Sequence, residues 1–241
     1  MGWLGDGSVK RQIARSVLPA GVRRRLLDLP TTVGYFKGPL LASALRKRWV
    51  VLRHPRVDIR FGRDTYLGPG FSLHAPFGGT FITGEGVEFR RNFRAELGGP
   101  DARIEIGSRS YLTYSVLIQC GASIRIGERC GLAHCTSVYD ANHRFRDLTR
   151  EFMDQGYDVR PITIEDDAQI HGLCTIVNSI GTRAVIGANS VVTRPIPAYT
   201  LAVGAPARVI DYFGPPGQDP RDAGPGEGAD TLGDQPAERA G

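Results

Sequence analysis

Residues 104–138 read IEIGSRSYLTYSVLIQCGASIRIGERCGLAHCTSV, and aliphatic residues return in this stretch every six positions. The period shifts by two residues at Ile126, resumes after an interruption and shifts once more at Ile180. Thirteen positions fit the template: Ile106, Leu112, Ile118, Ile124, Ile126, Leu132, Val138, Ile164, Ile170, Ile176, Ile180, Ile186 and Val192. Neither a helix nor an alternating strand has this spacing, so the sequence predicts a repeat architecture.

Small or β-branched residues keep the same period. They stand four places after many of the aliphatic positions: Ser110, Val116, Ala122, Thr136, Ala168, Cys174, Ala184 and Ser190. Glycine directly follows the aliphatic residue at Gly107, Gly127, Gly181 and Gly187, where a tight bend favours a residue without a Cβ. Three units of strand and turn would make one triangular coil. Because a lone coil cannot bury its aliphatic face, the coils must stack.

The charge is distributed unevenly along the 241 residues. Residues 1–56 hold 12 basic and 2 acidic residues, residues 57–210 hold 16 of each, and residues 211–241 hold 2 basic and 7 acidic residues. The basic excess therefore lies outside the repeat region, whereas a nucleic-acid footprint should cluster on a folded face or helix. We expect one domain with two tails and no specific nucleic-acid partner.

The two tails differ in pattern. Residues 8–29 mix aliphatic residues with arginines and predict a basic amphipathic helix. Residues 40–52, with Trp49 among basic residues, have the composition of an interfacial element, either in weak contact with a membrane surface or packed as a solvated helix. From residue 214 the chain is rich in Gly, Pro and acids without apolar periodicity, so residues 214–241 are expected to be a disordered tail.

The cysteines and the hydropathy indicate the compartment. Cys120, Cys130, Cys135 and Cys174 form no CxxC pair and have no accompanying histidine spacing, so we expect free thiols and no metal site. No run of eighteen apolar residues and no signal-peptide pattern is present, which favours a soluble, cytoplasmic protein.

The sequence resembles a known family most closely near residue 200. Residues 186–194 read IGANSVVTR, and residues 202–210 read AVGAPARVI. This text is similar to the terminal coil and exit segment of the hexapeptide-repeat acyltransferases, in particular sugar O-acetyltransferases of the galactoside and maltose acetyltransferase and exopolysaccharide-biosynthesis types. The resemblance is strongest over residues 104–210. It implies an all-β, left-handed parallel β-helix over residues 57–213, after a basic, partly helical segment 1–56, and a homotrimer with active sites between subunits.

A long excursion interrupts the repeat at residues 140–161, and such excursions from a regular scaffold tend to be functional. The resemblance implies that His143, near its start, removes the proton from the acceptor hydroxyl as it attacks a thioester. An imidazole, with a pKa of about 6.5, suits this role at neutral pH. Asp140 would either fix the imidazole tautomer or cap the turn that begins the loop.

The donor implied by the resemblance is acetyl-CoA. Residues of the family motifs that would contact it are His171, Gly172, Ala188, Thr193, Arg194 and Arg208. The small residues would leave room for the pantetheine arm, and the two arginines would bind the phosphates; the alternative is that both are ordinary surface residues. Residues before the loop would line the acceptor cleft: Tyr114, Ser115, Gln119 and Cys120. A nucleophilic role for Cys120 is not needed for direct transfer.

Two departures from the family pattern stand out. Residues 168–171 read Ala-Gln-Ile-His where the family has Val-Trp-Ile-Gly, which would alter the thioester channel. The step from Ile176 to Ile180 is two residues shorter than usual, so one turn must be tightened or a corner of a coil rearranged. The expected function is acetyl-CoA-dependent O-acetylation of a sugar or glycan precursor. The alternatives are N-acyl or longer-chain transfer onto an amino sugar or lipid-linked glycan, and a non-catalytic trimeric scaffold.

Overall fold

The computed structural model describes residues 38–222, so the helix predicted over residues 8–29 lies outside the described part. Helix α3 (Gly38–Arg53) covers the second basic and apolar run. The chain divides into two compact units between Arg46 and Lys47, inside this helix, and the coils described below belong to the second unit. Among residues 38–222, no helix has the length and apolar character needed to cross a membrane.

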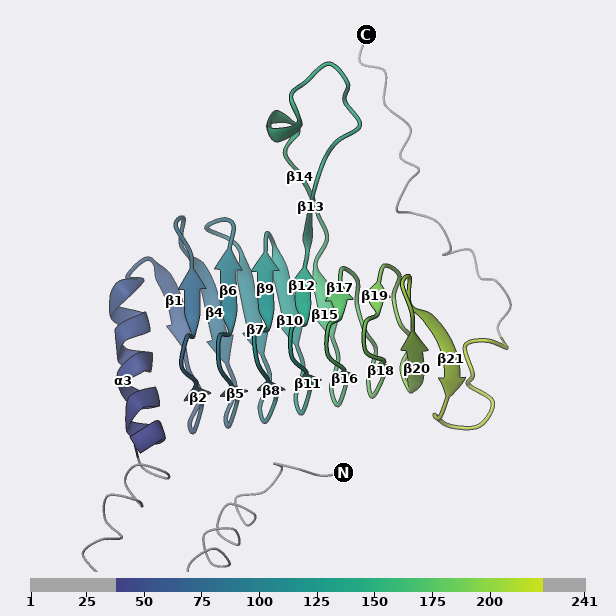
Figure 1. Cartoon of the computed structure of the whole chain (residues 1–241), viewed down its shortest axis with the longest axis horizontal. Coiled ribbons are helices and arrows are strands. Elements are labelled where there is room, and N and C mark those ends of the chain that lie inside the picture. Colours follow the sequence, from purple (N-terminus) through teal and green to yellow (C-terminus); the bar gives the residue numbers. More distant parts are fainter. Residues whose placement is uncertain (1–37, 223–241) are drawn as a thin grey trace, which may run out of the picture. The chain divides into compact units, whose positions relative to one another are not determined.

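From residue 57 the structure is mostly β, and its coils are built from three parallel sheets (Figure 1). Within each sheet, strands from successive coils pair with one another. The first sheet contains β1 (Val57–Arg60), β4 (Gly79–Thr83), β7 (Arg103–Ile106), β10 (Ser123–Ile126) and β15 (Ile162–Ile164). The second contains β2 (Tyr66–Leu67), β5 (Glu88–Phe89), β8 (Tyr111–Leu112), β11 (Gly131–Leu132), β16 (Gln169–Ile170), β18 (Val185–Ile186), β20 (Thr200–Val203) and the antiparallel β21 (Arg208–Tyr212). The third contains β3 (Ser72–His74), β6 (Arg94–Leu97), β9 (Leu117–Cys120), β12 (Ser137–Tyr139), β17 (Thr175–Ile176) and β19 (Val191–Val192).

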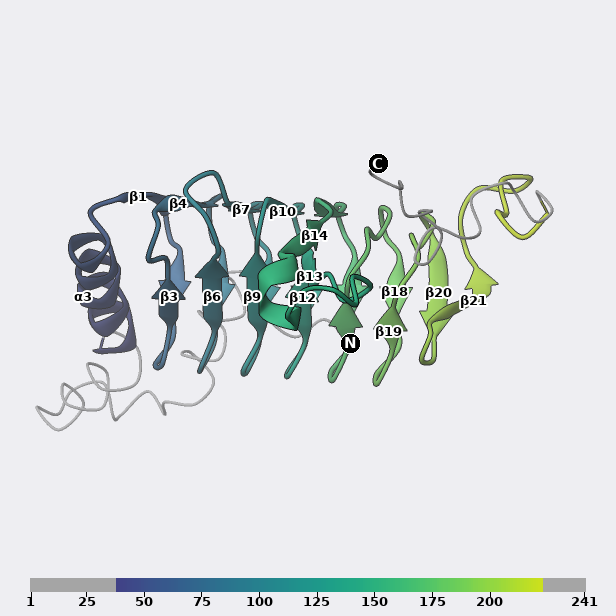
Figure 2. The same ribbon diagram turned by 90° about the horizontal axis from the view of Figure 1, so that it is seen from above.

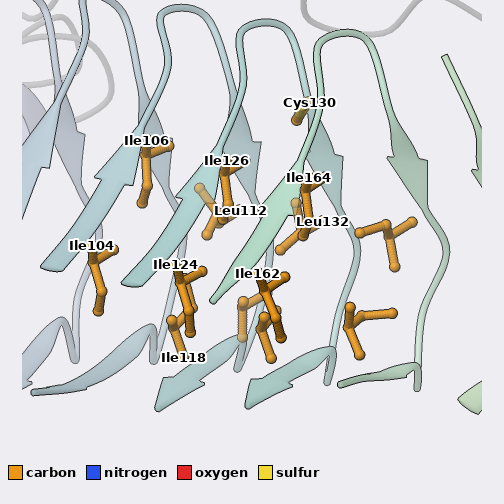
Figure 3. Packing of buried hydrophobic residues seen from close by; sticks show 14 of the residues in the cluster. Ile104, Ile106, Leu112, Ile118, Ile124, Ile126, Cys130, Leu132, Ile162 and Ile164 are labelled. Atoms are coloured by element: carbon orange, nitrogen blue, oxygen red, sulfur yellow. The ribbon is translucent and has the colours of Figure 1, made fainter. Parts of the chain in front are cut away.

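Each turn of the chain up to β17 adds one strand to each sheet, as in a parallel β-helix, and the later turns continue the first sheet only through the isolated bridges of Ile180 and Ile196. The expected all-β class and the parallel stacking are thus confirmed. All thirteen aliphatic positions of the six-residue template are exposed by 2% or less. Ile104, Ile124 and Ile162 lie one above another in the first sheet (Figure 3), in the register of the strand pairing. In the earlier coils phenylalanine replaces these aliphatic residues, with Phe81, Phe89 and Phe93 buried and in mutual ring contact.

The shifts in the six-residue period come from coils of different length. Ile104 pairs with Ile124, so this coil has 20 residues, whereas Ile164 pairs with Ile180, so that coil has 16. The shorter coil has fewer residues at the corner after β17. At this corner the buried Asn178 amide donates to the Thr193 carbonyl. The short step before Ile180 thus corresponds to a shortened corner between β17 and Ile180.

The glycines after the aliphatic residues have a different cause from the one expected. Gly107 and Gly127 do not have a positive φ, and the left-handed residues of these corners are Arg109 and Arg129. A Cβ on Gly107 would lie 2.5 Å from the carbonyl carbon of Gly127 in the next coil. Close stacking of coils, rather than a tight bend, therefore requires glycine here.

The excursion leaves the third sheet after β12 and returns to the first sheet at β15. It contains β13 (Ala141–His143), the 3₁₀ helix η3 (Phe152–Gln155) and β14 (Tyr157–Val159), and β13 pairs antiparallel with β14. Figures 1 and 2 show this hairpin projecting from the coils and carrying η3. At the other end, residues 214–222 of the predicted tail follow β21, and the Arg221 guanidinium donates to the Ile210 carbonyl. Residues 223–241 lie outside the described part.

Candidate active site

His143 contacts two aromatic rings of the excursion. It lies directly opposite Tyr157 in the β13–β14 pairing, and their ring centroids are 4.2 Å apart. Phe152, in η3, contributes the second ring at 5.1 Å. Sequence reasoning missed both partners, because no periodic pattern marks a contact made inside an irregular loop. The arrangement fixes the imidazole at the base of the loop.

Gln155 holds η3 in place. Its side chain is 8% exposed although the surrounding loop is open to solvent. The amide oxygen accepts from Asp147 N at 3.1 Å, and the amide nitrogen donates to the carbonyls of Asp147 at 2.9 Å and Arg150 at 3.2 Å. These three hydrogen bonds tie the two arms of the loop together. They thereby position Phe152 against His143.

The two ring nitrogens of His143 have different surroundings. Nδ1 is buried and has no hydrogen-bond partner among the described residues, whereas Nε2 is not among the buried unpaired atoms. Burial closes Nδ1 to a substrate hydroxyl, which leaves Nε2 as the candidate atom for a proton transfer. A general base needs the lone pair on that atom.

Asp140 caps a turn of the preceding coil. Its buried carboxylate accepts from the backbone N–H groups of Gly121 at 2.5 Å, Ala122 at 2.9 Å and Ser123 at 2.9 Å. No hydrogen bond joins it to His143 within residues 38–222. Asp140 therefore does cap a turn, but it is the turn of residues 121–123 and not the turn that begins the loop.

Cys120 points into the coil instead of lining a cleft, which corrects the expectation for this residue. Its thiol is buried, and it donates to an Asp140 carboxylate oxygen 3.5 Å away. Burial, together with the negative charge of Asp140, raises the pKa of the Cys120 thiol to about 12. Because the thiolate is the nucleophilic form, this residue is unreactive at neutral pH.

The other expected acceptor residues lie on or beside the third sheet. Tyr114 and Ser115 form the corner before β9, where Tyr114 is exposed and Ser115 adopts a φ of 57°. The Arg90 guanidinium carbon lies 5.9 Å from the centroid of the Tyr114 ring. Gln119, at the far end of β9, donates to the Glu96 carboxylate at 2.5 Å. These residues therefore lie at opposite ends of one short strand.

The expected donor residues also divide between two corners. His171, Gly172 and Ala188 lie at corners between the second and third sheets, whereas Thr193 and Arg194 follow β19 at the corner toward the first sheet. Arg208, exposed, begins β21. The structure does not gather the twelve expected residues at one place in a single chain. Most of them lie near the two ends of the strands of the third sheet, whereas Arg208 is in β21 of the second sheet.

Gly172 has a structural reason within the chain. A Cβ at this position would collide with the imidazole of His134 in the preceding coil. Gln169, which stands where the family has tryptophan, accepts from the Tyr111 hydroxyl at 2.9 Å and donates to the Arg129 carbonyl at 3.2 Å. The departure at this position thus replaces an aromatic wall with a hydrogen-bonded amide.

A cavity of about 700 Å³ lies inside the excursion, and the first residue of its lining, Arg144, directly follows His143 in the sequence. Its lining is Arg144, Phe145, Arg146, Asp147, Leu148, Arg150, Gln155 and Asp158. Arg144 is paired with Asp158 at 2.6 Å across the hairpin. Over residues 38–222, no group of three or more His, Cys, Asp or Glu side chains is arranged to hold a metal ion.

Comparison with known proteins agrees with this architecture. No family model matches the chain. The probable acetyltransferase Rv3034c of Mycobacterium tuberculosis is 31% identical over 185 residues, which are 71% of this chain and 60% of that protein. The galactoside O-acetyltransferase of Escherichia coli is 31% identical over 112 residues, 45% of this chain and 54% of that enzyme. The chain thus spans little more than half the length of these curated relatives.

A solved structure extends the likeness over most of the chain. The hexapeptide-repeat acetyltransferase VCA0836 of Vibrio cholerae, complexed with acetyl coenzyme A, is 25% identical with a TM-score of 0.52, covering 82% of this chain and 92% of that one. Parallel coils with a six-residue period and an excursion that carries a histidine are the features that the structure shows. In sequence and architecture the chain is similar to the hexapeptide-repeat acetyltransferases.

Proposed function

We propose that the protein transfers an acetyl group from acetyl-CoA to a hydroxyl of a sugar or glycan precursor, with His143 as the general base. The observation that carries the proposal is the fixed imidazole of His143, in contact with Phe152 and Tyr157 on the excursion. We further propose that the coils are left-handed and that the protein works as a cytoplasmic homotrimer. In a trimer, residues at one end of the strands of the third sheet would meet residues at the other end of the same strands in a neighbouring subunit, and together they would form one site.

The chemistry requires one proton carrier. The acceptor oxygen attacks the thioester carbonyl carbon while its proton moves to Nε2 of His143. The tetrahedral intermediate then expels the coenzyme A sulfur, which takes the proton back from the imidazolium. Atoms and charges balance without a covalent enzyme intermediate, in agreement with the buried, protonated Cys120 thiol.

The donor end is supported by the C-terminal coils. Arg194 and Arg208 are exposed, and they occupy the positions at which the sequence motifs of the family have phosphate-binding residues. Guanidinium groups suit such dense negative charge because they donate several hydrogen bonds in a fixed plane. Thr193 and Ala188 would flank the pantetheine arm. The acetyl coenzyme A complex of the Vibrio relative supports this donor.

The proposal is tested by release of free thiol from acetyl-CoA with a panel of sugars and nucleotide sugars. His143→Ala should lower acceptor-dependent release roughly 10²- to 10⁴-fold, the usual contribution of a positioned base. His74→Ala is the control, because His74 is an exposed histidine at the end of β3, in the first coil and outside the excursion. Undiminished release by His143→Ala would refute its role.

The product distinguishes the alternatives. An O-acetyl ester is cleaved by neutral hydroxylamine, whereas an N-acetyl amide survives. A hydroxylamine-stable product would replace the proposed O-transfer with N-transfer. If the wild type neither binds acetyl-CoA nor releases thiol with any acceptor, the remaining readings are a longer-chain donor and a scaffold.

A further inference from the structure

Helix α3 carries a row of apolar residues that faces solvent. Leu41, Leu45, Trp49 and Leu52 follow one another at intervals of four, four and three residues, which places them on one face of an α-helix. Each of these side chains is between 59% and 74% exposed. We call these four residues the outer stripe.

The outer stripe is not the face that packs on the protein. Val50 is buried and belongs to the hydrophobic core, and it is rotated by about 100° from its neighbour Trp49 around the helix axis. A surface helix normally presents one apolar stripe to the core and a polar face to solvent. Here the face away from Val50 is also apolar. A contiguous apolar surface of this kind marks an interaction site.

The charges around the stripe identify the chemistry of its partner. Helix α3 contains Arg46, Lys47, Arg48 and Arg53 and no acidic residue. At 100° per residue, the exposed Arg48 and Arg53 lie on either side of the stripe. Residues 1–37 hold seven basic and two acidic residues, and a second copy of α3 carries the same positive charge, so neither complements the stripe electrostatically. The partner must be negative and must offer an apolar layer.

The geometry points to a membrane surface containing acidic lipids as the partner of the outer stripe. The helix lies in the plane of the headgroups, the three leucines and Trp49 enter the acyl boundary, and the flanking arginines pair with lipid phosphates. Nucleic acid supplies the negative charge but no layer in which leucines are buried. This inference concerns where the protein resides and does not depend on the acetyl-transfer reaction.

Vesicle flotation of the full chain tests the contact. The protein should float with vesicles of phosphatidylcholine and phosphatidylglycerol, and not with phosphatidylcholine alone. Raising the salt concentration should release it, because the attraction is screened. Leu52→Glu should lower the bound fraction about tenfold, since it puts an anion into the stripe. Val51→Glu is the matched control: it makes the same charge change at an exposed neighbour that points about 100° away. Equal loss for both variants would refute the stripe.

Trp49 provides a second readout. In a Trp3→Phe background it is the one tryptophan left, and its emission should shift to the blue when acidic vesicles are added. Emission that is already blue-shifted without vesicles would mean that the chain or a second copy covers the stripe. That result, or absence of flotation with acidic vesicles, would overturn the inference. Thiol release with a soluble acceptor should be unchanged in Leu52→Glu.

Discussion

The coils and the excursion are built in opposite ways. In the coils aliphatic side chains are buried and most charged side chains point outward, whereas in the excursion Leu148 is 95% exposed and the buried side chains are the polar Asp140 and Gln155. Apolar burial therefore stabilises the coils, and three hydrogen bonds of one amide hold the excursion. The difference teaches that the scaffold and the candidate base are stabilised separately, so each can be weakened without the other.

The reactivity of the cysteine thiols tests whether the interior of the coils excludes solvent. Cys120, inside the coil, has a pKa raised to about 12 from an ordinary 9.0, whereas Cys135 is exposed at a corner. Because the thiolate is the reactive form and Cys120 is also buried, iodoacetamide should label Cys135 at least about a hundredfold faster than Cys120. Peptide mass spectrometry of a time course gives both rates. Comparable labelling of Cys120 in the folded protein would contradict a sealed interior.

Truncation of one apolar residue in each region tests the difference in stability. Ile124→Ala should lower the free energy of unfolding by about 2–5 kcal/mol, because Ile124 is fully buried between Ile104 and Ile162. Leu148→Ala, in the excursion, should change it by no more than about 0.5 kcal/mol. Urea unfolding followed by circular dichroism gives both values. A large effect of Leu148→Ala would show that the excursion supports the coils.

Two glycines distinguish the two reasons why a position can require glycine: close contact with a neighbouring coil and a conformationally free backbone. A Cβ on Gly107 meets the backbone of Gly127, whereas a Cβ on Gly99 has nothing within 4 Å, and neither residue has a positive φ. Gly107→Ala should therefore cost about 1–3 kcal/mol of unfolding free energy. Gly99→Ala should be neutral or stabilise by up to about 1 kcal/mol, because it restricts the unfolded chain. Equal effects in thermal unfolding would mean that the coils adjust to the added methyl group.

The sequence predicts the coils well because each inward position repeats the same physical requirement. Ile106 and Ile186 are 80 residues apart, yet both are buried for the same reason. The cause of the glycines was misread, because contact between coils cannot be seen within one repeat. Phe152, Tyr157 and Gln155 escaped prediction for a related reason: their contacts occur once and follow no period. His143 could be singled out by its place at the start of the excursion, whereas its aromatic neighbours could not.

The smallest expected effect concerns those neighbours. Tyr157→Leu removes one of the two rings beside His143, and an aromatic pair contributes about 0.5–1.5 kcal/mol, so kcat should fall roughly 2- to 10-fold. Tyr157→Phe keeps the ring, and the hydroxyl makes no hydrogen bond with the residues that the structure describes, so it should retain wild-type kcat. The KM for acetyl-CoA should not change in either variant, because Tyr157 lies on the excursion and the expected phosphate contacts lie in the C-terminal coils. An equal loss in both variants would assign the effect to the hydroxyl. A loss confined to Tyr157→Leu, at constant thermal stability, would show that the excursion acts by holding the imidazole, while the coils supply only the platform.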